Sequence, residues 1–142
     1  MKKLICLILC VCFLFSFAAC GKETSPADDS KIIAQDDVTN ATVILFKDER
    51  GKVLFYNSDI KQIYAVDNPE LGYVIEIEMT EDGAKKLKEA TEILVGQNMK
   101  MYMGDVPMVS AMVVAPIEDG RFILCDHTTQ EEMLIMFDKL TK

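Results

Sequence analysis

The sequence of 142 residues predicts an α+β fold, in which an antiparallel sheet carries two amphipathic helices on one face. Three patterns lead to this prediction. Residues 73–79 alternate apolar with mostly charged side chains, which is typical of a half-buried strand. Two later segments, after Thr80 and after Thr129, repeat apolar residues at three- and four-residue spacing, as amphipathic helices do. Short β-rich runs separated by turn residues account for much of the remaining chain.

A β-hairpin is expected at the start of the folded domain, which we place at residues 41–142. Residues 41–46 and 52–56 are rich in β-branched and aromatic side chains, and Gly51 between them can take the left-handed conformation of a turn. A short element around residues 61–66 should follow. Whether the hairpin completes the main sheet or forms a separate reduced unit is open at this stage.

Both predicted helices carry capping signals. Thr80 is the expected N-cap of the first helix, and Gly96 marks its end. Thr129 and Glu132, three residues apart, form the pattern of a capping box at the start of the second helix. The residues expected on the core side are Ala84, Leu87, Ala90, Thr91 and Leu94 in the first helix and Met133, Phe137 and Leu140 in the second.

Three extended runs are expected between the helices. Residues 99–103 alternate methionine with other side chains, residues 108–115 form a second β-like run, and residues 121–125 follow a turn at residues 118–120. Cys125 ends the last run, and we expect it to be a small buried residue of that strand. From residue 73 onward the order is therefore strand, helix, three extended runs and helix.

The N-terminus has the order of a signal peptide: a basic start, an uncharged run and small residues. The uncharged run, residues 4–19, is shorter than the roughly 20 residues that a membrane-spanning helix needs. It resembles a bacterial lipoprotein signal, in which the cysteine after the cleavage site is acylated. The resemblance implies removal of residues 1–19 by cleavage between Ala19 and Cys20, with lipid attached to Cys20. Simple secretion and an uncleaved N-terminal anchor are the alternatives.

Charge and composition restrict the partners. The formal net charge is −8, whereas nucleic acid and anionic lipid headgroups both require a basic surface. We therefore expect no nucleic-acid partner, and we expect membrane contact through the N-terminal lipid. Residues 20–40 are mostly polar and are expected to form a flexible tether between lipid and domain. Cys125 is the one cysteine after Cys20, so a mature chain would contain no internal disulfide.

Four motifs occur in this chain in the same order as in one known family. They are Asp59-Ile60 before a strand, the junction Thr80-Glu81-Asp82-Gly83-Ala84, Asp105 followed by Val109-Ser110-Ala111, and Gly120-Arg121 followed by Thr129, Glu131 and Glu132. Over residues 57–140 this pattern resembles the head of the first extracytoplasmic domain of SecD and SecDF. Those proteins are membrane accessory subunits of the protein-export translocase.

The resemblance implies a ferredoxin-like fold and contact with unfolded polypeptide outside the membrane. It does not extend to the transmembrane helices that carry the proton-linked chemistry of the family. We therefore expect a non-catalytic lipoprotein on the extracytoplasmic face of the cell membrane. Its partner would be unfolded exported polypeptide, the translocase or another envelope membrane protein. The alternative is a structural adaptor that clamps one neighbour in an envelope complex.

The methionines offer a candidate contact surface. Met99, Met101 and Met103 share one face of the expected strand, and Tyr102 lies between them in sequence. Core packing is the favoured interpretation, an adaptable surface for peptide or partner contact is the second, and binding of Cu(I) by the thioethers is the third. His127 is the sole histidine, so we expect no metal site and no cofactor. The sequence contains no catalytic motif, and we expect no enzyme activity.

Overall fold

The computed structural model describes residues 30–125 and 127–142. The predicted signal peptide, the cleavage site at Ala19 and Cys20, and the first part of the predicted tether lie outside the described residues. The elements are β1 (Lys31–Asp36), β2 (Ile44–Lys47), β3 (Val53–Tyr56), the 3₁₀ helix η1 (Asn57–Asp59), β4 (Ile60–Asn68), β5 (Gly72–Met79), α1 (Glu81–Leu94), β6 (Asn98–Met103), β7 (Val106–Met112), β8 (Arg121–Leu124) and α2 (Gln130–Thr141).

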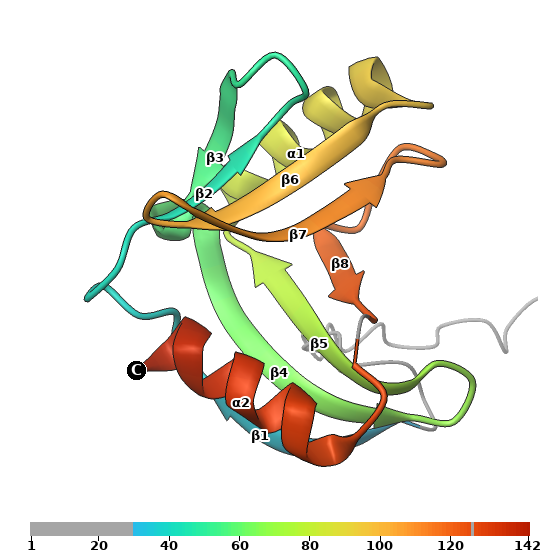
Figure 1. The fold of residues 1–142 in the computed structure, drawn as a ribbon. Coiled ribbons are helices and arrows are strands. Elements are labelled where there is room, and N and C mark those ends of the chain that lie inside the picture. Colours follow the sequence, from blue (N-terminus) through green and yellow to red (C-terminus); the bar gives the residue numbers. More distant parts are fainter. Residues whose placement is uncertain (1–29, 126) are drawn as a thin grey trace, which may run out of the picture.

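The strands form two four-stranded antiparallel sheets (Figure 1). Sheet I has the order β1-β4-β5-β8, and sheet II has the order β3-β2-β6-β7. The predicted α+β class, with antiparallel pairing and two helices, is confirmed. The strands that we expected in one sheet are divided between two, because β6 pairs with β2 of the hairpin while β8 pairs with β5.

One aromatic cluster joins the two sheets into a single core. Phe46 and Phe55, from the β2–β3 hairpin, stack with ring centroids 4.4 Å apart. Phe122 of β8 approaches Phe46 edge-on at 5.2 Å, and all three side chains are buried. The hairpin predicted at residues 41–56 is therefore an integral part of sheet II and of the shared core.

The two helices pack as their apolar faces predict. Helix α2 contacts β4 and β5 of sheet I, whereas α1 contacts β3, η1 and β5 and so touches elements of both sheets. The apolar side chains that are buried along the helices are Leu87 and Leu94 in α1 and Met133, Phe137 and Leu140 in α2.

The predicted helix boundaries are confirmed by the capping contacts. The Gly83 N–H donates a hydrogen bond to the Thr80 hydroxyl at 3.1 Å, and the Glu132 N–H donates one to the Thr129 hydroxyl at 3.2 Å. The Glu132 carboxylate accepts the Thr129 N–H in return, which completes the capping box. Gly96 follows the end of α1 with a φ of 81°, a conformation that glycine adopts without steric cost.

Part of the predicted tether is a strand. Residues 20–40 were expected to be flexible, but Lys31–Asp36 forms β1 and pairs antiparallel with β4. Its central Ile33 and Ala34 pack against the core, and farther along the Thr39 N–H donates to the Leu140 carbonyl oxygen at 2.7 Å. The expectation of a flexible tether is therefore wrong for this segment. The reason is non-local: the edge of β4 supplies the hydrogen bonds, and the core the contacts, for the short apolar patch at residues 32–34.

Candidate functional site

An apolar groove with a volume of about 340 Å³ lies between β7 of sheet II and β8 of sheet I. Both strands are at the edge of their sheets among the described residues (Figure 1). The groove reaches the shared core, because buried Phe46 and Phe122 belong to its lining. The complete lining is Phe46, Met99, Met101, Val109, Ala111, Met112, Val113, Val114, Ala115, Ile117, Arg121, Phe122, Ile123 and Leu124.

Strand β7 supplies one wall of the groove. Its register with β6 places Val109 opposite Met101 and Ala111 opposite Met99, so these four side chains share one face of sheet II. Met99 and Met101 are buried, but Ala111 on the same face is exposed. The core-facing side of sheet II is therefore uncovered where it reaches β7.

A second wall is formed by residues 113–117, which we call the strap. This segment follows β7, leads toward β8 and passes the C-terminal end of α1. Val113 exchanges two backbone hydrogen bonds with the residues that follow α1: its N–H donates to the Gln97 carbonyl at 2.9 Å, and its carbonyl accepts the Gly96 N–H at 2.8 Å. The Ile117 N–H donates to the hydroxyl of buried Thr91 at 2.9 Å. The first two bonds extend the pairing of β6 with β7 by one residue, because Val113 follows Met112 in the register that pairs Met112 with Asn98. The third bond fixes the end of the strap to α1.

The structure separates the four predicted contact residues into two pairs. Met99 and Met101 line the groove and are 8% and 2% exposed, so their thioethers pack in the core below it, as the favoured interpretation predicts. Met103 and Tyr102 are half-buried and lie outside the groove lining. The Lys47 ammonium lies 4.7 Å from the centroid of the Tyr102 ring, so that ring already has a cationic neighbour. Contact of any of these residues with a polypeptide remains a prediction.

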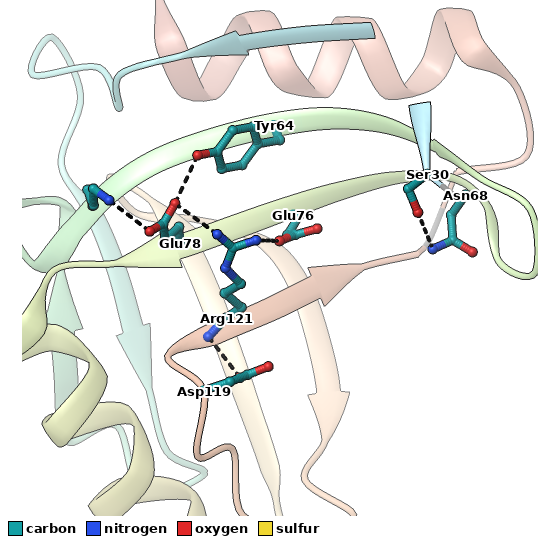
Figure 2. A network of polar contacts seen from close by, with 8 residues as sticks. Ser30, Tyr64, Asn68, Glu76, Glu78, Asp119 and Arg121 are labelled. Atoms are coloured by element: carbon teal, nitrogen blue, oxygen red, sulfur yellow. Dashed lines mark hydrogen bonds and ion pairs between the residues drawn. The ribbon is translucent and has the colours of Figure 1, made fainter. Parts of the chain in front are cut away.

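A cluster of charged residues ties β8 to the rest of sheet I (Figure 2). Arg121 donates to Glu76 with its Nη1 at 2.6 Å, and its Nη2 lies 3.4 Å from Glu78. Glu78 also accepts hydrogen bonds at 2.9 Å from the Lys61 ammonium and from the Tyr64 hydroxyl. Because these residues come from β4, β5 and β8, the cluster holds the groove wall formed by β8 in place.

The cluster shifts the pKa values of its members. Burial, followed by the hydrogen bond to Glu78 and the negative charge of that carboxylate, raises the pKa of Tyr64 to about 12. Burial by itself would raise the pKa of Glu78, but the hydrogen bonds from Lys61 and Tyr64 and the charge of Arg121 outweigh it and hold this pKa below its usual value. Glu78 is therefore ionised and Tyr64 neutral at neutral pH.

Cys125 was expected to be buried in a strand, but it is exposed. The reason is that β8 ends at Leu124, one residue earlier than the apolar run in the sequence. No group of three or more His, Cys, Asp or Glu side chains in the described part of the chain could hold a metal ion.

The strap was not predicted as part of a site. Its first three residues, 113–115, belong to the strand expected at residues 108–115, whereas β7 ends at Met112 and Ile117 is bound to α1. One signal was available in the sequence, because residues 106–115 contain no charged side chain although half of them or more are exposed. An exposed uncharged stretch of this kind is a common property of interaction surfaces.

The fold is similar to that of SecDF. A crystal structure of SecDF in a super-membrane-facing form gives a TM-score of 0.53 at 21% identity, over 58% of this chain and 11% of that chain. A structure of the membrane component SecDF that enhances protein export gives a TM-score of 0.58 at 16% identity, over 66% of this chain and 59% of that chain. The chain thus spans less than two thirds of either structure. No protein-family model and no curated protein matches the chain.

Neither helix in the described residues has the length and apolar character needed to cross a membrane.

Proposed function

We propose that this protein is a non-catalytic, lipid-anchored extracytoplasmic domain that binds unfolded polypeptide in the groove between β7 and β8 as an accessory of protein export. The observation that carries the proposal is the groove itself: an apolar cavity that opens into the core between two sheet edges. The SecDF-like fold supports the export context, because one of the similar structures is described as enhancing protein export.

The chemistry of the groove favours polypeptide over a small polar ligand. Its lining consists almost entirely of aliphatic, aromatic and thioether side chains, and its charged member, Arg121, is held by Glu76 and Glu78. Such a surface has no set of polar groups to orient a specific small molecule. It can accept apolar side chains of different shapes, and adaptable methionines at its floor fit that use. We expect weak binding of many sequences.

The anchoring part of the proposal rests on the sequence. Cys20 after Ala19 is the position at which lipid would be attached, and it precedes β1 by a short polar segment. A lipid at this position would hold the groove close to the membrane surface, where exported chains emerge.

Filling the groove tests the proposal. Ala111 is exposed on the groove face of β7, so Ala111→Trp would place an indole ring in the cavity. Ile93 is exposed on α1 and lies outside the groove lining, so Ile93→Trp is the matched control. The ligand is a secreted protein kept unfolded by reduction and alkylation of its cysteines, titrated against the intact chain in detergent micelles.

The expected result is that A111W weakens binding by at least about tenfold, the equivalent of 1.4 kcal/mol, while I93W leaves it unchanged. Thermal unfolding of both variants checks that the fold is intact. Equal affinities for the two variants would show that polypeptide does not occupy the groove. Absence of binding to the unaltered chain would remove the proposed function.

A further inference from the structure

We infer that the polypeptide binds as an added β-strand along the free edge of β7 and places every second side chain in the groove; this inference rests on the proposed function. Strand β7 pairs with β6 on one side and has no partner on the other side among the described residues. Its outer edge therefore presents unpaired backbone N–H and C=O groups beside the groove.

The composition of β7 distinguishes it from the other sheet edges. Residues 106–115 carry no charge. Pro107 and the register shift beside it protect the first part of β7, but residues 109–112 contain no charge, no proline and no bulge. The edge strand β1 has a charged residue at each end and a bulge, whereas β3 and β8 are only four residues long. Natural proteins usually protect an apolar edge with charges, prolines or bulges, so the part of β7 after the register shift, residues 109–112, indicates a place for strand pairing.

The register of sheet II determines on which face each side chain of an added strand would lie. Side chains alternate between the two faces of a sheet, so every second residue of the new strand would continue the face of Met101 and Val109 and enter the groove. The intervening residues would continue the face of Lys100 and Ser110, which is toward solvent on β7. The preferred ligand is thus an extended segment with an apolar residue at every second position. A helix would leave the edge of β7 unpaired.

Charge adds a second element of selectivity. The chain has a formal net charge of −8, so basic residues flanking the apolar positions would be attracted and acidic ones repelled. We therefore identify the substrate class as extended, alternating apolar and polar segments with Lys or Arg at their ends.

Backbone methylation of a peptide tests strand addition separately from groove binding. The probe is the peptide Lys-Val-Thr-Val-Thr-Val-Thr-Val-Lys, about as long as β7 with one residue added at each end. One derivative is N-methylated at all valines and a second at all threonines, which leaves every side chain unchanged. Successive N–H groups of a strand point to opposite edges, so only one derivative can lose its hydrogen bonds to β7. Affinities are measured with the intact chain in detergent micelles.

The expected result is that one methylated derivative binds at least about tenfold more weakly than the other, which keeps the affinity of the unmodified peptide. Alternate β7 amides should also gain protection from hydrogen exchange when the unmodified peptide binds. Equal affinities for both derivatives would overturn strand addition and leave groove binding intact. Failure of the peptide to bind while the unfolded secreted protein does bind would overturn the alternating pattern. Failure of both ligands would instead refute the proposed function.

Discussion

Asp59 connects η1 to the start of α1 through both its carboxylate and its backbone carbonyl. The carboxylate accepts hydrogen bonds from the Lys86 ammonium at 2.6 Å and from the Tyr56 N–H at 3.0 Å. The carbonyl oxygen accepts the Thr80 N–H at 2.8 Å and lies against Gly83 in the first turn of the helix. A residue without Cβ is required at this contact, because any Cβ at Gly83 would overlap the Asp59 carbonyl.

We predict that Gly83→Ala destabilises the protein. At an ordinary helical site this change would stabilise by about 1 kcal/mol, because alanine has the higher helix propensity. Here the new methyl group would force α1 away from η1, and we expect a net loss of about 2 kcal/mol in the free energy of unfolding. Urea denaturation measures the effect.

The matched control is Glu89→Ala at an exposed position of the same helix, which should change stability by less than about 0.5 kcal/mol. If G83A were as stable as the unaltered protein or more so, the close approach of Asp59 and Gly83 would be refuted.

At the scale of elements, the Arg121 cluster connects three strands that are distant in sequence. The Glu78 carboxylate accepts hydrogen bonds from two residues of β4 and forms an ion pair with Arg121 of β8 (Figure 2). This carboxylate therefore interacts with both strands that neighbour β5 in sheet I. The pKa of Glu78 is lowered in the folded chain, which means that folding favours the ionised form. The corresponding stability is present above the unfolded pKa of about 4.3 and is lost as the pH falls through the folded value.

We predict that Glu78→Gln reduces the free energy of unfolding by about 1 to 2 kcal/mol at pH 7, because it removes charge-assisted hydrogen bonds. The difference between this variant and the unaltered protein should shrink as the pH falls below the unfolded pKa of about 4.3 and through the lower pKa of folded Glu78, where the carboxylate becomes protonated. Urea denaturation across this pH range measures the difference. Exposed Glu89→Gln serves as the control and should show no such convergence. A difference between E78Q and the unaltered protein that stays constant with pH would contradict the role assigned to the Glu78 charge.

Elements with strong local signals could be predicted from the sequence. Both helices begin at the predicted caps, and the alternating run at residues 73–79 lies within β5. Elements that depend on a distant partner could not. Lys31–Asp36 is a strand because β4 pairs with it, and the chain leaves the sheet after Val113 to reach α1, where the Thr91 hydroxyl accepts the Ile117 N–H.

At the scale of the whole molecule, too, features that depend on contacts between distant residues could not be predicted from the sequence. Division of the strands into two sheets follows from pairing between residues far apart, such as Phe46 opposite Met101 and Ile77 opposite Phe122. The groove is a consequence of this division, since it lies between an edge strand of each sheet. The alternation of Met99 and Met101 indicated which face they would occupy. It could not indicate that the cavity above them would stay open.

At the scale of the whole molecule, the proposed function combines a membrane-proximal anchor at Cys20 with binding of an extended chain in the apolar groove. An export accessory of this kind should meet many different substrates, each briefly. A structural adaptor would instead keep one partner. The identity and number of the proteins that touch the groove in the cell therefore separate the two functions.

The most direct measurement is photo-crosslinking in living cells from Val114, followed by mass spectrometry of the adducts. Val114 lines the groove and is 82% exposed, whereas the control position Leu71, 52% exposed in the turn between β4 and β5, lies outside the groove lining. We predict adducts to many unfolded secreted proteins from Val114 and few from Leu71. A single envelope protein crosslinked from Val114, or the same set of adducts from both positions, would contradict the proposal that the groove binds exported polypeptide.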